Sequence, residues 1–135
     1  MQNERLKKQI QFLIEVDKLK QVYRNTILMD ASRKENDAEH SWHLAMAAIV
    51  LRDSVDEPVD LLHVIKMVLI HDLVEIDAGD TYIYANANPA EKHEKESKGA
   101  QRIFGLLPPD LAREFMDLWQ EFEAAQTAEA RFANA

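Results

Sequence analysis

Turn-forming residues are scarce in this chain, and their scarcity limits it to a largely helical fold. Only 3 glycines and 4 prolines occur in 135 residues. No stretch alternates apolar and polar side chains as a half-buried strand does. The pattern therefore predicts an all-α fold, a single domain over residues 1–135 built as a bundle of about five to six helices.

Capping residues and apolar spacing locate the first two helices. We expect a first helix over roughly 3–22 and a polar connection over roughly 23–35. Asn36, with Glu39 three positions later, has the pattern of a capping box and starts a second helix over about 37–53. This second helix is apolar nearly all round, which predicts a central position in the bundle.

Proline, glycine and a capping threonine set the remaining boundaries. The stretch Asp56-Glu57-Pro58 opens a third helix, because acidic residues and proline both favour a helix start. This helix runs to about Asp77, and Gly79 can stop it. Further helices are expected over about 90–104 and 109–125, and Thr127 caps a short sixth helix.

Charge and cysteine content narrow the choice of partners. The net charge is −8, which disfavours a nucleic-acid polymer because such binding needs clustered cations. The absence of cysteine excludes disulfides and thiolate zinc sites. No apolar stretch approaches the roughly 20 residues of a membrane span, and the N-terminus has no signal-peptide core. We therefore expect a cytoplasmic protein without a membrane partner.

A histidine and an aspartate, His71 and Asp72, directly follow the apolar run of the third predicted helix. A buried polar group without a partner costs about 2–7 kcal/mol. A shared metal ion would remove this cost, since neighbouring positions on a helix can converge on one ion between helices. Glu75 lies four residues after His71, on the same helical face. The alternative is a helix end that emerges into water with His71 and Asp72 solvated.

The second predicted helix carries two further histidines, His40 in its first turn and His43 three residues later. His40 is the better candidate ligand, whereas His43 is followed by Leu44 and is expected to be a hydrogen-bonded core residue. Glu39 has a local role, as the capping carboxylate or as the group that orients an imidazole. Nitrogen and oxygen donors without sulfur suit Mn²⁺, Co²⁺, Fe²⁺, Ni²⁺ or Zn²⁺ more than a Ca²⁺ cage.

Taken together, these residues resemble a known family. Glu39-His40 at the start of an apolar helix, His71-Asp72 with Glu75, and Gly79-Asp80 are similar to the HD-domain metal-dependent phosphohydrolases. The similarity is greatest to the small stand-alone branch that contains 5′-deoxynucleotidases, and it covers nearly the whole chain. The resemblance implies an HD-type helical bundle in which His40, His71 and Asp72 bind one divalent metal ion, with Mg²⁺ as a further candidate.

The resemblance also implies an activity, that of a metal-dependent phosphomonoesterase. We expect a 5′-nucleotidase that releases phosphate from (deoxy)ribonucleoside 5′-monophosphates with a metal-bound water. Glu75 would orient the attacking water or act as general acid/base. Arg24 matches the phosphate-binding arginine of the branch, with Arg33 as a weaker alternative. Asp80 matches the position close to the sugar.

Some features leave alternatives open. In the family a fourth metal ligand, an aspartate, follows the Ala-Arg-Phe segment, so we expect that this sequence lacks its C-terminal helix or helices. Another HD-type hydrolase, acting on a cyclic nucleotide, a nucleoside triphosphate or an alarmone, is the second hypothesis. A non-catalytic helical interaction module is the third hypothesis. We expect a homodimer from the resemblance and because most oligomers are symmetric dimers.

Overall fold

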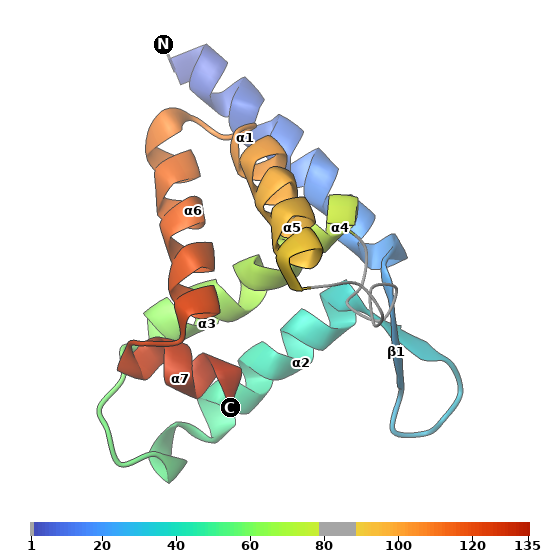
Figure 1. Ribbon diagram of the computed structural model, residues 1–135, viewed down its shortest axis with the longest axis vertical. Helices are drawn as coiled ribbons and strands as arrows, with labels where there is room; N and C mark the ends of the chain where they lie inside the picture. Colours follow the sequence, from blue (N-terminus) through green and yellow to red (C-terminus); the bar gives the residue numbers. More distant parts are fainter. Residues whose placement is uncertain (1, 79–88) are drawn as a thin grey trace.

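Helices make up most of the chain, as Figure 1 shows for the computed structural model, which describes residues 2–78 and 89–135. The all-α fold class is therefore confirmed. The α-helices are α1 (Gln2–Val16), α2 (Asp37–Val50), α3 (Leu61–His71), α4 (Glu75–Ala78), α5 (Pro89–Phe104), α6 (Pro109–Ala124) and α7 (Ala128–Asn134). Within the described residues, the short 3₁₀ helices are η1 (Asp17–Gln21), η2 (Arg52–Ser54) and η3 (Asp72–Val74).

The helix starts that depend on local caps are confirmed. The Asn36 side chain accepts a hydrogen bond from the Glu39 amide at 2.9 Å, and the Glu39 carboxylate accepts one from the Asn36 amide at 3.1 Å. Thr127 caps α7 by accepting from the amide of Ala130 at 3.1 Å. Such caps satisfy amides that have no partner within the helix, and they need only residues close in sequence.

The expectation of a strand-free connection over 23–35 is wrong. Strands β1 (Tyr23–Ile27) and β2 (Lys34–Asn36) form an antiparallel ribbon in which Tyr23 pairs with Asn36. The ribbon projects from the helical body (Figure 1), and Tyr23 and Ile27 are more than half exposed. The less exposed side chains of the ribbon include the charged Arg24 and Glu35, which are 25% and 15% exposed, so the ribbon lacks the apolar alternation that marks a buried strand.

The third helix begins later than expected and is not continuous. It starts at Leu61, where the Asp60 side chain accepts from the His63 amide, and it ends at His71. The 3₁₀ turn η3 then separates it from α4. The backbone of α5 packs closely here, because a Cβ on Gly99 would lie 2.8 Å from the Val74 carbonyl oxygen. The break therefore coincides with close packing of α5, a segment distant in sequence, and sequence spacing does not reveal such packing.

The core is centred on α3, and the expectation that α2 is central is wrong. Helix α3 contacts α2, α6 and α7, whereas Trp42 and Val50 of α2 are 63% and 70% exposed. Helix α2 instead contributes the small residues Ala45 and Ala48 to a minor cluster with Val64 and Val68. The main core joins α1, α3, α5, α6 and α7 through Phe12, Leu19, Met67, Ile70, Leu73, Val74, Ala100, Ile103, Phe104, Leu107, Leu118, Trp119 and Ala130.

None of the helices within residues 2–78 and 89–135 combines the length and the hydropathy that a membrane-spanning segment requires.

Candidate metal centre

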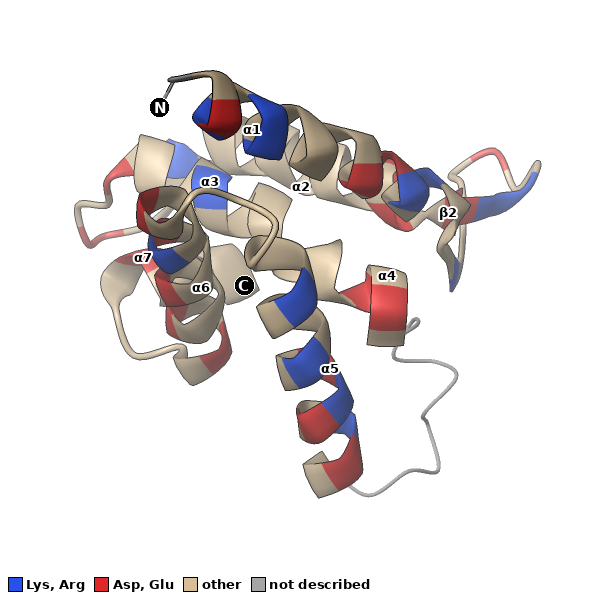
Figure 2. Cartoon of the chain, turned by 90° about the horizontal axis from the view of Figure 1, so that it is seen from above, with Lys and Arg blue, Asp and Glu red and all other residues tan. Residues whose placement is uncertain are grey.

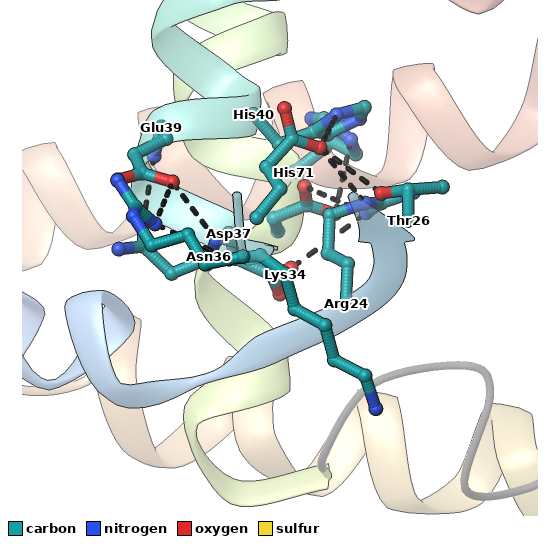
Figure 3. A network of polar contacts seen from close by, with 11 residues as sticks. Arg24, Thr26, Lys34, Asn36, Asp37, Glu39, His40 and His71 are labelled. Atoms are coloured by element: carbon teal, nitrogen blue, oxygen red, sulfur yellow. Dashed lines mark hydrogen bonds and ion pairs between the residues drawn. The ribbon is translucent and has the colours of Figure 1, made fainter. Parts of the chain in front are cut away.

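The candidate site lies where the β-ribbon, the start of α2 and the end of α3 meet (Figure 3). Arg24 comes from β1, and His40 lies in the first turns of α2. His71 is the last residue of α3, Asp72 opens η3, and Glu75 opens α4. Five predicted site residues are therefore supplied by five separate elements, each near one of its ends.

Three buried carboxylates form the acidic cluster of this site. Asp37, Asp72 and Glu75 are 0%, 5% and 7% exposed. Each offers a carboxylate oxygen, and these oxygens lie within 4.8 Å of one another. Carboxylates this close repel one another away from water, and a cation placed among them offsets that repulsion. The arrangement is therefore suited to a divalent cation.

The guanidinium of Arg24 supplies part of the positive charge beside this cluster. Its Nη1 atom lies 3.6 Å from Asp37 Oδ1 and 3.8 Å from Asp72 Oδ2. Its Nε atom lies 3.7 Å from Glu35 Oε1. Arg24 thus adjoins the acidic cluster and is only 25% exposed, in a position where a phosphate could meet it next to a bound cation.

His71 presents one ring nitrogen to Asp72. Its Nδ1 atom lies 2.7 Å from the Val68 carbonyl oxygen, and because a carbonyl only accepts, Nδ1 carries the proton. The Nε2 atom lies 3.0 Å from Asp72 Oδ1. Two ligand atoms about 2.1 Å from one ion, at right angles to each other, are about 3 Å apart. The two side chains therefore already have a separation that a shared ion accepts. The Phe122 ring stacks on the imidazole at 4.2 Å.

The same contact shifts the pKa values of both groups. Burial alone would lower the pKa of His71, but the hydrogen bond and the charge of Asp72 outweigh it and raise the pKa above its ordinary value. Burial acts in the opposite sense on Asp72, where the contact with His71 and the charge of Arg24 lower the pKa overall. Each partner thus favours the charged form of the other.

His40 is oriented by a carboxylate from the ribbon. Its Nδ1 atom lies 3.0 Å from Glu35 Oε1, which also accepts from Thr26 Oγ1 at 3.2 Å. Burial, followed by the charge of Arg24, lowers the pKa of His40 and so favours its neutral imidazole. A neutral imidazole held at Nδ1 by a carboxylate leaves Nε2 for a metal, as in most metal-binding histidines. Asp72 also acts electrostatically on His40, but among the described residues the group whose ligand atoms all lie within 4.8 Å of one another is Asp37, Asp72 and Glu75, without either histidine.

Other residues singled out from the sequence lie elsewhere. Arg33 is 51% exposed and pairs with Glu39 instead of the acidic cluster. Glu39 has the expected capping role. His43 is exposed and lies against the Trp42 ring at 6.3 Å, so the expectation of a core role for it is wrong. Asp80 falls outside the described residues.

Two site residues, Glu35 and Asp37, were not foreseen. Glu35 fell in a predicted loop, where an acidic side chain is usual, and only its strand pairing brings it beside Arg24 and His40. Asp37 is in the first turn of α2, where an acidic residue is already favoured by the helix dipole. Its complete burial is the signal of a further role, and burial is visible only in the folded structure.

Comparison with known proteins gives consistent matches. A family model described as HD domain matches residues 16–135. Human 5′-deoxynucleotidase HDDC2 is 33% identical over 124 residues, which are 91% of this chain and 59% of the human protein. The Dictyostelium discoideum 5′-deoxynucleotidase HDDC2 is 32% identical over 101 residues, 71% of this chain and 53% of that protein. The chain thus spans little more than half of the length of these relatives.

Two solved structures share the fold. A predicted metal-dependent phosphohydrolase from Magnetospirillum magnetotacticum MS-1 is 55% identical with a TM-score of 0.88, over 96% of this chain and 66% of that chain. A conserved hypothetical protein from Pyrococcus furiosus is 25% identical with a TM-score of 0.67, over 93% of this chain and 74% of that chain. Because the family model covers most of the sequence, this chain belongs to the HD-domain family.

Proposed function

We propose that this chain carries the active site of a metal-dependent 5′-nucleotidase, which hydrolyses (deoxy)ribonucleoside 5′-monophosphates to nucleoside and phosphate. The observation that carries the proposal is the short distance, 3.0 Å, between His71 Nε2 and Asp72 Oδ1. This pair of side chains lies beside buried carboxylates and the guanidinium of Arg24. The likeness to proteins named 5′-deoxynucleotidase supports this substrate class.

The proposed metal ligands are His40, His71 and Asp72. Both imidazoles have Nδ1 engaged by an acceptor, so each can present Nε2. When bound, the divalent ion supplies an activated water near neutral pH and offsets charge on the phosphoryl group. Mn²⁺, Co²⁺, Fe²⁺, Ni²⁺ and Zn²⁺ suit these donors, and Mg²⁺ is a further candidate. The fourth ligand, an aspartate beyond the Ala-Arg-Phe segment, stays a prediction.

Arg24 is proposed to bind the phosphate. A guanidinium can donate two parallel hydrogen bonds to phosphate oxygens, and Arg24 already lies beside the acidic cluster. Arg33 stays the weaker alternative, since it pairs with Glu39. The contact of Asp80 with the sugar also stays a prediction.

Glu75 is proposed to handle the proton of the reaction. Its carboxylate is buried within the acidic cluster, where it can orient a water molecule or hold the proton that the water releases. The water oxygen bonds to phosphorus, the bond from phosphorus to the 5′-oxygen breaks, and that oxygen takes up a proton. The products are a nucleoside and inorganic phosphate.

We further propose a homodimer and a cytoplasmic location. Large apolar side chains on the outer face of α2 support a contact between copies, since Trp42, Ile49 and Val50 are 63%, 48% and 70% exposed.

A phosphate-release screen tests the proposed function. The purified chain is assayed with Mn²⁺ or Co²⁺ against nucleoside 5′-monophosphates, cyclic nucleotides and nucleoside triphosphates. We expect release from the monophosphates, lost in His71→Ala and retained in Lys98→Ala, whose side chain is 73% exposed. Release only from cyclic nucleotides or triphosphates would favour another HD-type hydrolase. No release from any substrate by a chain that binds the metal would favour a non-catalytic module.

A further inference from the structure

The short helix α4 carries Glu75 but is too short to hold its own position. It comprises four residues, Glu75–Ala78, and isolated helices shorter than about 12 residues are marginal in water. The direction of the Glu75 carboxylate must therefore be set by what α4 packs against. Helix α5 is the principal neighbour of α4, and Figure 2 shows the acidic α4 beside the C-terminal half of α5.

One arginine of α5, Arg102, holds α4 through a bidentate contact. Its Nε donates to Asp77 Oδ2 at 2.5 Å, and its Nη2 donates to Asp77 Oδ1 at 2.8 Å. The same Nη2 donates to Glu15 Oε1 of α1 at 2.6 Å. Hydrogen bonds to Asp77 first, and then to Glu15, raise the pKa of Arg102. Exposed ion pairs usually add little stability, but a guanidinium that binds one carboxylate with two nitrogens and also a second carboxylate has the geometry of the stronger pairs.

The backbone of α5 also packs against Val74, the residue before Glu75. Gly99 lies one helical turn before Arg102, and a Cβ there would be 2.8 Å from the Val74 oxygen and 3.5 Å from Asp77 Cβ. Helix α5 thus touches the residue before Glu75 and the residue two positions after it. Residues two apart on a helix point to opposite sides, so Asp77 can reach Arg102 while Glu75 enters the acidic cluster.

We propose that Arg102 is a positioning residue for the reaction: by holding Asp77 it fixes α4 and directs the Glu75 carboxylate into the acidic cluster. The inference rests on the proposed function for the role of Glu75. Arg102 itself bonds to Asp77 and Glu15, outside that cluster. Its removal should therefore change turnover more than substrate affinity, because misplacement of a reacting group by about 1 Å costs up to about 100-fold in rate.

The test compares Arg102→Gln with Arg102→Lys and with Arg5→Gln. Arg5 is a matched control, since its guanidinium makes a bidentate contact of 2.7 Å and 3.0 Å with Asp110 and joins α1 to α6. We expect Arg102→Gln to lower kcat at least about tenfold with KM nearly unchanged. Arg102→Lys should recover part of the loss, because it keeps the charge without the fork. Arg5→Gln should leave kcat unchanged, and thermal unfolding of each variant reports its stability.

Hydrogen exchange separates this inference from the proposed function. Amides of residues 75–78 should exchange faster in Arg102→Gln than in the original chain, and Arg5→Gln should leave them unchanged. If the original chain releases no phosphate, the proposed function fails while the exchange data still decide whether Arg102 holds α4. If the original chain is active, an unchanged kcat in Arg102→Gln overturns the inference. Unchanged exchange at 75–78 overturns it in either case.

Discussion

The positive charge of Arg24 has two opposing effects on the proposed site. Arg24 lies beside Asp37 and beside Asp72, a proposed metal ligand, and it is also proposed to bind phosphate. Its positive charge opposes a cation in the same cluster but attracts an anionic substrate. Removing this charge should therefore have effects of opposite sign on the binding of the metal ion and on the binding of the substrate.

Arg24→Gln should raise the KM for a nucleoside monophosphate at least about tenfold, since a charged hydrogen bond contributes about 1.5–3 kcal/mol. The affinity for Co²⁺, measured by calorimetry without substrate, should stay the same or increase. Arg33→Gln is the control, because Arg33 is 51% exposed and pairs with Glu39. A rise in KM for Arg33→Gln alone would transfer the phosphate role to Arg33.

Elements whose limits depend on nearby residues were predictable, and those set by distant packing were not. The caps at Asn36 and Thr127 correctly located α2 and α7. The ribbon was missed because its strands are largely exposed and carry no apolar alternation. The break after His71 was missed because the local sequence gives no sign that α5 approaches Val74. The candidate ligands His40, His71 and Asp72 come from residue type, spacing and the family resemblance, and they stay predictions, whereas Glu35 and Asp37 could be recognised only in the fold.

Gly99→Ala tests how closely α5 must approach the turn before α4. In an open helix this change stabilises by about 0.5–1 kcal/mol. Here the new methyl group would meet the Val74 carbonyl oxygen at 2.8 Å, and such overpacking costs about 1–3 kcal/mol. We therefore expect a lower midpoint in urea unfolding, with Lys98→Ala on the same helix as control. A higher midpoint would show that α5 can move away from α4 without loss.

At the scale of the whole molecule, α3, α6 and α7 are joined by one carboxylate. Glu121 of α6 accepts from Thr127 Oγ1 at 2.6 Å and lies 2.7 Å from His63 Nε2 of α3. Arg131 Nη2 of α7 donates to both carboxylate oxygens of Glu57, at 2.7 Å and 3.0 Å. These contacts place α7 across α3, the helix that ends at His71. These contacts therefore support the proposed metal centre indirectly, by stabilising the packing of α3, α6 and α7.

The pH dependence of folding should reveal the contribution of Glu121. Burial raises its pKa, but the hydrogen bonds from Thr127 and His63 outweigh burial and lower the pKa overall. A carboxylate whose pKa is lower in the folded chain stabilises the folded state at pH values above the unfolded pKa of about 4.3, and this contribution is lost as the pH falls through the folded pKa.

Urea unfolding in EDTA should show Glu121→Gln clearly less stable than the original chain at pH 7. The difference should shrink below about pH 4.3, since other carboxylates titrate alike in both chains. Glu114→Gln, which removes a surface ion pair on the same helix, should cost at most about 1 kcal/mol at pH 7. A difference between Glu121→Gln and the original chain that stays constant from pH 7 to pH 3 would contradict the assignment.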